Sequence, residues 1–353
     1  MVSISRKLAG FTVNALNTNC RRAYTLPDTT FQADPLARFK AIAATTNERP
    51  RVLITGALGQ LGRVNYFYLD ILNQPCIERF VVDHRIDTIV HFSALLSAIG
   101  EQNVSLSLQV NCRGVENILE VARKHQLKVF IPSTIGAFGP TTPRDNVPDS
   151  TIQAPTTIYG VSKVYAERLG EYYHHKFGVD FRCLRFPGII STTKPGGGTT
   201  DYAIEIFYEA LKRGRYTCYL RPDTKLPLMY DTDCMASVVQ FLSAPSESLT
   251  HRTYNVTGFS FTPVDIANAI KKIIPHFKID YSICNVRQSI ADSWPRSLDD
   301  SEAKKDWGWR AEYGLDETVQ VMLALLQRDA DKIAKEDLNP KEALDTIKAL
   351  NKG

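Results

Sequence analysis

The sequence predicts an α/β protein built on a doubly wound, mainly parallel sheet, with a smaller lobe toward the C-terminus. Short apolar segments of strand length alternate with longer segments whose apolar residues recur at helical spacing. A glycine-rich turn directly follows the first of these strands, at residues 55–62. Strands that alternate with helices are typical of parallel sheets covered by helices on both faces.

The elements of the first domain follow from these patterns in chain order. Apolar runs such as RVLIT and IDTIVHFSA predict buried strands, whereas the stripe in SLQVNCRGVENILEVARKHQ predicts a helix. The predicted strands lie at 51–55, 86–94, 128–134 and 180–190, and the predicted helices at 107–126 and 156–177. Together they indicate a dinucleotide-binding domain over 51–186.

After residue 186 the regular alternation weakens. The run PGGGTT (195–200) predicts a loop, because consecutive glycines disfavour both helix and strand. Residues 200–214 and 261–275 then show the amphipathic spacing of helices. We expect a substrate-binding lobe over 187–326, followed by a charged helical tail over 327–353.

The N-terminal segment has a distinct composition. Arg6, Lys7, Arg21 and Arg22 precede the first acidic residue, Asp28. A basic, hydroxyl-bearing and acid-free N-terminus is typical of a mitochondrial transit peptide, although an ordinary flexible tail is the alternative. We expect a transit peptide over 1–27, a connector over 28–50 and a mitochondrial matrix protein.

Composition argues against several kinds of partner. The formal net charge is only +4 and the basic residues are dispersed, which argues against a nucleic-acid partner. No apolar run approaches the roughly 20 residues that cross a bilayer, so we expect no membrane partner. The seven cysteines are scattered without a CxxC pair, and His174-His175 lacks a ligand at metal spacing, so we expect no metal.

The glycine turn indicates a dinucleotide cofactor. Gly56, Gly59 and Gly62 follow the apolar strand VLIT. Glycines at such a turn let the backbone bend sharply and approach the pyrophosphate, which then lies on the N-terminus of the following helix. A purely structural turn is the alternative.

A second motif indicates proton transfer to or from a hydroxyl. Tyr159 and Lys163 are four residues apart, so a helix would place them on one face. A nearby ammonium favours the phenolate of a tyrosine, whose ordinary pKa of about 10 makes it a poor base at neutral pH. Ser133 and Thr134, at the end of a predicted strand, can supply a hydroxyl that orients the substrate oxygen.

Several longer motifs give the chain a family resemblance. HFSALLSAIGE, PSTIGAFGP, YGVSKVYAERLGEYY, RFPGIIS and PGGGTTDYA, which lie between about Arg51 and Leu326, resemble L-threonine 3-dehydrogenases of the extended short-chain dehydrogenase/reductase (NAD-dependent epimerase/dehydratase) family. The resemblance implies a Rossmann-type fold, NAD as cofactor, and oxidation of L-threonine to 2-amino-3-ketobutyrate. It also implies a homodimer formed through helices that include the YxxxK helix.

The resemblance assigns a role to individual positions. Tyr159 would be the acid/base, Lys163 would hold the nicotinamide ribose, and Thr134, with Ser133 beside it, would bind the reacting oxygen. The substrate would contact Ser97, Thr134, Tyr159, Gly198, Thr199 and Thr200. The cofactor would contact Thr55, Gly56, Leu58, Gly59, Gln60, Leu61, Gly62, Asp70, Ile71, Ala94, Leu95, Tyr159, Lys163, Pro187 and Ile189.

The chain departs from the family pattern at 63–80. The family has a helix, a second strand ending in the acid that binds the ribose, and a third strand there; a βαβ unit alone takes about 30 residues. In one alignment, residues 66–72 are the third strand, Asp70 and Ile71 flank the adenine, and residues 76–85 are the next helix. The first helix, the second strand and the acid are then deleted, as in a splice variant, a gene-model error or a decayed copy.

A rival alignment retains the second strand. It makes residues 64–74 the first helix and 80–83 the second strand, so that Asp83 is the ribose ligand. The deletion is favoured because VVDHRIDTIVHFSA matches the family's helix and strand. Two further functions remain as alternatives: a family member with impaired or no catalysis, and a nucleotide-sugar epimerase or dehydratase.

Overall fold

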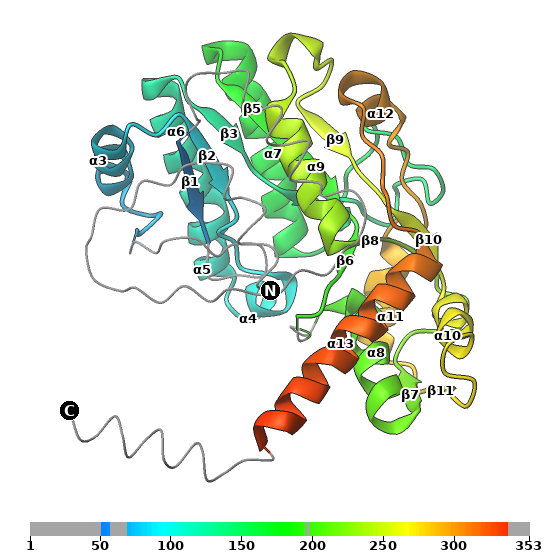
Figure 1. Ribbon diagram of the computed structural model, residues 1–353. Helices are drawn as coiled ribbons and strands as arrows, with labels where there is room; N and C mark the ends of the chain where they lie inside the picture. The colour runs from blue at the N-terminus through cyan, green and yellow to red at the C-terminus, as the bar shows by residue number, and fades with distance from the viewer. Residues whose placement is uncertain (1–50, 57–68, 194, 196–197, 338–353) are drawn as a thin grey trace, which may run out of the picture.

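The computed structural model describes residues 51–56, 69–193, 195 and 198–337. Its main sheet is parallel, and β3 and β4 pair with successive parts of β5. The strands are β1 (Val52–Thr55), β2 (Thr88–His91), β3 (Lys128–Phe130), β4 (Ser133–Thr134), β5 (Asp180–Phe186) and β9 (Thr253–Asn255). The order is β1, β2, β3, β5, with β4 also pairing with β5 beyond the end of β3 and β9 pairing with β5 as well (Figure 1). The predicted parallel α/β sheet is confirmed.

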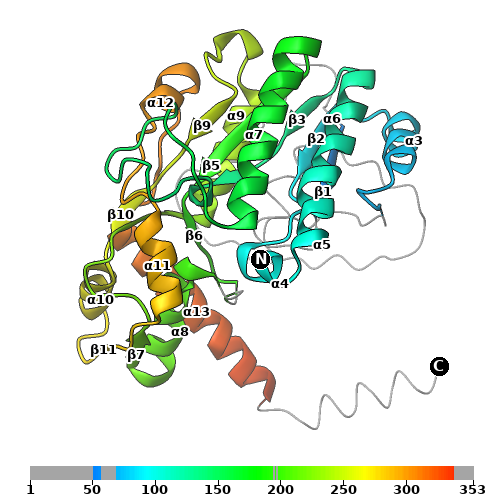
Figure 2. The same cartoon turned by 180° about the vertical axis from the view of Figure 1, so that it is seen from behind.

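Helices cover both faces of this sheet. One face carries α3 (Gln74–His84), α6 (Gly114–His125) and α7 (Ile158–Phe177), and the other carries α9 (Asp231–Ser243) (Figures 1 and 2). Alternate strand residues divide between the two cores, because side chains alternate across a strand. Phe181 packs toward α3, α6 and α7, for example, whereas Leu184 packs toward α9.

Prolines end two of the predicted strands early. The strand predicted at 128–134 is split into β3 and β4 at Pro132, and the strand predicted at 180–190 is split at Pro187. Proline has no backbone N–H and so cannot donate to a sheet ladder. After Pro187 the chain continues as β6 (Gly188–Ile190), which pairs with β8 (Leu226–Tyr230) in a separate sheet.

The helix predicted over 107–126 consists of several segments. It begins as α5 (Val104–Leu108), passes through the π-helical turn η2 (Gln109–Arg113) and continues as α6. Just before it lies α4 (Ser97–Gln102). A π-turn changes the direction of the side chains that follow and often occurs at functional sites.

The second lobe has its own core. In it β8 pairs with β6 and β10 (Phe259–Phe261), and β7 (Arg215–Cys218) pairs with β11 (Lys278–Tyr281). Buried residues of α8, α10 and α13 pack around these strands. The helices of this lobe are α8 (Tyr202–Arg213), α10 (Pro263–Lys271), α11 (Asn285–Ser293) and α13 (Leu315–Asp337). Helix α12 (Ser301–Trp307) follows α11 in the chain but packs beside β9 of the main sheet.

The predicted boundary at residue 326 lies inside a helix. In α13, Val319, Met322 and Leu326 are buried in the lobe, and the helix continues to Asp337. The lobe and the first part of the predicted tail are therefore one continuous element. The transit peptide (1–27), the connector (28–50) and residues 338–353 lie outside the described residues.

The region after the glycine turn decides between the two alignments. Phe80–Asp83 lies within α3, and Asp83 is an exposed helical residue, so the strand of the rival alignment is wrong. The strand predicted at 66–72 is also wrong for its described part, because 69 and 70 are irregular and 71 and 72 lie in a turn. A strand needs a neighbour for its hydrogen bonds, and the strand that would lie beside it is the one inferred to be deleted.

One property of the helices bears on membranes. Within residues 69–193 and 198–337, no helix has the length and the apolar character needed to span a bilayer.

Candidate active site

Helix α7 places the predicted proton-transfer residues at its start. The Thr157 side chain caps the helix by accepting a hydrogen bond from the Gly160 amide at 3.1 Å. The Glu101 carboxylate, from α4, accepts a hydrogen bond from the Ile158 amide at 2.7 Å. These two contacts fix the first turn, which carries Tyr159.

Thr134 and Tyr159 meet at the end of β4. The Thr134 side chain is close enough to the Tyr159 hydroxyl to act on its pKa, and a methyl group at the adjacent Gly136 would lie 3.4 Å from Thr134 Cγ2 and 3.7 Å from Tyr159 Cδ1. Burial raises the pKa of Tyr159 to about 12, and Thr134 opposes that rise. The pair predicted to bind the reacting oxygen is therefore brought together.

Lys163 lies one turn further along α7, beneath Tyr159. Its Nζ donates to the Pro132 carbonyl at 2.7 Å and lies 5.6 Å from the centre of the Tyr159 ring. Burial lowers the pKa of Lys163 to about 8, while Cys183 and Glu167 act against that change. The ammonium is held where it can stabilise a phenolate on Tyr159.

Ser133 is turned away from this group. Neighbouring residues of a strand point to opposite faces, and the Ser133 hydroxyl donates to the buried Glu167 carboxylate. Of the two hydroxyls predicted from the sequence, the one on Thr134 contacts Tyr159 and the one on Ser133 contacts Glu167.

The glycine turn is described only at its start. Gly56 has φ of +73°, and a methyl group there would lie 2.7 Å from the Ser93 backbone nitrogen, so glycine is required. Thr55, just before it, is buried with its hydroxyl 2.7 Å from His91 Nδ1. Outside the described residues lie Leu58, Gly59, Gln60, Leu61 and Gly62.

Gly56→Ala is expected to destabilise the protein by more than Gly178→Ala. Both glycines have φ of +73°, but a methyl group at Gly178 would have no heavy atom within 4 Å. We expect a loss of about 1–2 kcal/mol at Gly178 from the backbone alone, and a larger loss at Gly56 from the added clash. Urea unfolding of both variants measures the difference, and equal losses would contradict the close approach at Gly56.

The residues predicted to contact the adenine and the middle of the cofactor lie in two loops, one before α3 and one after β2. Asp70 is exposed, and its carboxylate accepts from the Leu72 amide at 2.9 Å in the turn before α3. The Ile71 carbonyl accepts from Asn117 at 2.9 Å. Ala94 is half-buried, and the Leu95 backbone makes two hydrogen bonds with the Asn111 side chain, at 2.8 and 3.0 Å.

The two segments predicted for the nicotinamide and the substrate lie side by side. A methyl group at Gly188, between Pro187 and Ile189, would lie 2.9 Å from Thr200 Cγ2. The Tyr219 hydroxyl donates to the carbonyls of Gly198 and Thr199, at 3.3 Å each. Ser97 begins α4, and its side chain lies outside the described part of the structure.

Three residues near the site belong to none of the predicted motifs. Asn111, in the π-turn, also donates to the Ser162 hydroxyl at 3.2 Å, which links the Leu95 loop to α7. His91 is buried, and burial together with Lys163 lowers its pKa to about 3, so its ring is neutral. Glu167 follows Lys163 by one further turn, a spacing that the sequence does show.

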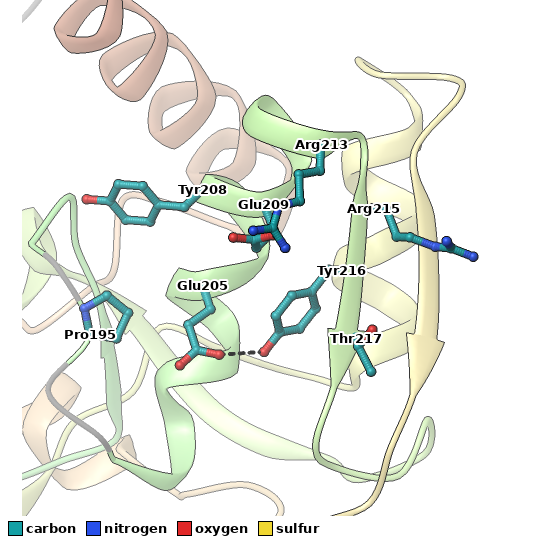
Figure 3. Close-up of a pocket in the computed structure, with 8 residues that line it drawn as sticks. All are labelled: Pro195, Glu205, Tyr208, Glu209, Arg213, Arg215, Tyr216 and Thr217. Carbon is teal, nitrogen blue, oxygen red and sulfur yellow. Dashed lines mark hydrogen bonds and ion pairs between the residues drawn. The ribbon is translucent and has the colours of Figure 1, made fainter. Parts of the chain in front are cut away.

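A separate hollow of about 610 Å³ lies on the second lobe, between α8 and β7 (Figure 3). Its charged side chains are already paired. The Tyr216 hydroxyl donates to Glu205 at 2.8 Å, Arg213 pairs with Glu209 at 3.3 Å, and Arg215 pairs with Asp280 at 2.9 Å. It is a cleft between paired surface charges, and none of the predicted site residues lines it.

Comparison with known proteins agrees with this geometry. Residues 40–257 match the model of the NAD dependent epimerase/dehydratase family. The mitochondrial L-threonine 3-dehydrogenase of Bos taurus is 46% identical, over 92% of this chain and 96% of that protein. The crystal structure of L-threonine dehydrogenase from Phytophthora infestans matches with a TM-score of 0.77 and 49% identity, over 79% of this chain and 99% of that one.

A second solved structure gives the same result. The L-threonine dehydrogenase of Clostridium difficile matches with a TM-score of 0.78 and 42% identity, over 79% of this chain and 98% of that one. These matches cover nearly the whole length of each relative.

The lengths of the alignment also bear on the deletion. The bovine alignment has 359 positions, yet 92% of this 353-residue chain is only about 325 residues, so about 34 positions lack a residue of this chain. This shortfall is close to the roughly 30 residues of a βαβ unit. It agrees with the deletion predicted after the glycine turn.

Proposed function

This chain belongs to the NAD dependent epimerase/dehydratase family, and on that premise we propose that it oxidises the side-chain hydroxyl of L-threonine with NAD to 2-amino-3-ketobutyrate. The observation that carries the proposal is the group formed by Thr134, Tyr159 and Lys163. The relatives named L-threonine 3-dehydrogenase support the substrate.

The residues of the group divide the work. Thr134 binds the substrate hydroxyl and holds it against Tyr159, whose phenolate oxygen accepts the hydroxyl proton. Lys163 stabilises that phenolate with its ammonium, which the Pro132 carbonyl holds in place. When bound, NAD would accept the hydride from the substrate carbon that carries this hydroxyl.

The described residues fit NAD at its nicotinamide end. Of the three protons on Lys163 Nζ, one is used by Pro132, which leaves donors for a ribose hydroxyl. We propose that Pro187 and Ile189 flank the nicotinamide and that Gly198, Thr199 and Thr200 hold the amino acid. The close approach of Gly188 to Thr200, which brings the two segments together, supports this assignment.

The rate is expected to rise with pH in the range from about pH 6 to about pH 8. The pKa of Tyr159 lies near 12, so its ionised fraction grows about tenfold for each pH unit. The pKa of Lys163 is about 8, so its ammonium is largely kept up to about pH 7 and falls to about half at pH 8, a loss smaller than the tenfold gain in phenolate. Initial rates of NADH formation at saturating NAD measure the slope; a flat profile would contradict Tyr159 as the base.

We propose that the protein is a homodimer through α5 and α7, which contact each other. Both helices expose apolar side chains, and such exposed groups are typical of interaction surfaces. The exposed fractions are 44% for Val104, 40% for Leu106, 42% for Leu108, 47% for Val161 and 37% for Tyr165.

Light scattering after gel filtration is expected to give about twice the 39.6 kDa chain mass. The double substitution Leu106→Asp and Val161→Asp is expected to give the monomer, because a dimer would bury unpaired carboxylates. Val286→Asp, at a position on α11 that is 71% exposed, is the control and should leave the mass unchanged. A wild-type mass of one chain would refute the dimer.

The mitochondrial matrix is the proposed location. The composition of residues 1–27 and the mitochondrial relative support it. A fluorescent protein fused after residue 27 should enter mitochondria, and a diffuse cytosolic signal would oppose import. We also propose a dinucleotide-binding domain over 51–186 and a substrate-binding lobe from 187 onward.

A further inference from the structure

A buried ion pair lies directly behind the proton-transfer group. Glu167, on α7, and Arg185, on β5, are 0% and 1% exposed. Arg185 Nε donates to Glu167 Oε1 at 3.0 Å, and Arg185 Nη2 donates to Oε2 at 2.8 Å. The fork of the guanidinium thus matches both carboxylate oxygens, which fixes the orientation of each side chain.

Glu167 is joined to the site by two routes. On α7, it is one turn beyond Lys163, which is itself one turn beyond Tyr159, so the three residues share a face. Through space, Glu167 Oε1 accepts the hydroxyl of Ser133, the residue that precedes Thr134. The carboxylate therefore contacts the strand end that carries Thr134.

Arg185, the partner of Glu167, is held in place by the sheet and by two further contacts. In the sheet, Ser133 is opposite Arg185, and Thr134 is opposite Phe186. Arg185 Nη1 donates to the Asp149 carbonyl at 2.7 Å, and the guanidinium lies 5.4 Å from the centre of the Phe138 ring. Because β4 has only two residues, these contacts define where its end lies.

A buried ion pair is a poor source of stability. Well-packed apolar residues of similar size are often as stable or more so, because removing two charges from water is costly. A role in fixing geometry therefore accounts better for this pair than a contribution to stability does.

We propose that Glu167, with Arg185 as its counter-ion, is a positioning residue that holds Ser133 and thereby aims the Thr134 hydroxyl at Tyr159. This role rests on the proposed function, because Thr134 and Tyr159 are the groups that meet the substrate hydroxyl. Glu167 touches neither of them directly and acts through Ser133.

The test is a double-mutant cycle on kcat with L-threonine. Ser133→Ala removes the hydroxyl that Glu167 binds, and Glu167→Gln removes the charge. Each is expected to lower kcat about 10- to 100-fold, the cost of misplacing a reacting group. The double variant should be no slower than Glu167→Gln alone, since both changes break one chain of contacts.

The matched control is Glu171→Gln, one turn further along α7. Its carboxylate binds Arg168 at 2.9 Å and the Thr253 hydroxyl at 3.0 Å, so it tests the loss of a helical glutamate away from the site. Its kcat should stay within twofold of wild type. Multiplicative losses in the double variant, or an unchanged kcat in Ser133→Ala, would overturn the proposal.

A crystal structure of Ser133→Ala tests the proposal if a variant does not fold or shows no turnover. If Glu167→Gln does not fold, Ser133→Ala decides alone. The crystal structure of Ser133→Ala should show the Thr134 hydroxyl further from the Tyr159 hydroxyl than in the wild type, and an unchanged separation would overturn the role of Glu167. A wild-type chain that forms no NADH with L-threonine would refute the proposed function only, because the crystallographic arm needs no turnover.

Discussion

Tyr159→Phe is expected to lower kcat with L-threonine by about 10²- to 10⁴-fold, the usual contribution of a positioned acid or base. The ring and its packing remain, and only the hydroxyl on which Thr134 acts is lost. Steady-state NADH formation measures the loss, and thermal unfolding shows whether the variant is folded.

Tyr172→Phe is the matched control for this prediction. Tyr172 is on the same helix, is 54% exposed and packs its ring near Tyr173 and Phe177. Its loss of a hydroxyl should leave kcat unchanged. A Tyr159→Phe protein that keeps more than a tenth of the wild-type rate would remove Tyr159 from its role as the base.

Restoring the deleted block is expected to tighten NAD binding by about 10- to 100-fold. Each hydrogen bond between a ribose hydroxyl and a carboxylate contributes about 1.5–3 kcal/mol, and about 1.4 kcal/mol is a factor of ten in Kd. The block would be taken from the bovine relative and inserted after Gly62. Isothermal titration with NAD compares the two chains.

A second insert separates the carboxylate from the rest of the block. It carries alanine in place of the ribose-binding acid, so it restores the helix and the strand alone. We expect an intermediate Kd, because the helix N-terminus still faces the pyrophosphate. Equal Kd values for the unmodified and restored chains would contradict the deletion as a defect in the cofactor site.

The structure gives this prediction a physical basis. Among the described strands, β1 pairs with β2 alone and forms one edge of the sheet. In the usual order of this fold, the first strand lies inside the sheet with the second strand beside it. The described residues after the turn lead through 69–72 into α3.

Local patterns were sufficient for much of the fold and the site. Helix α7 and strands β1 and β2 lie where apolar spacing predicted them, and the i, i+4 spacing placed Tyr159 and Lys163 on one face. The ends of strands were less predictable, because Pro132 and Pro187 reroute the chain by removing single hydrogen-bond donors.

Residues that act through distant contacts could not be predicted this way. Asn111 looks like an ordinary helical residue in the sequence, and only the π-turn directs its side chain to Leu95 and Ser162. Glu167 precedes Arg168 in a charged stretch that suggests solvent exposure. Its burial depends on the ion pair with Arg185, and the packing of β5 against α7 brings the two side chains together.

The most direct test of the proposed function is NADH formation by the unmodified chain with L-threonine, followed by absorbance over a range of NAD concentrations. We predict turnover that requires L-threonine and saturates only at higher NAD than in the restored chain. No NADH at any NAD concentration, from a protein that still unfolds cooperatively, would contradict it and leave a catalytically silent member of the family.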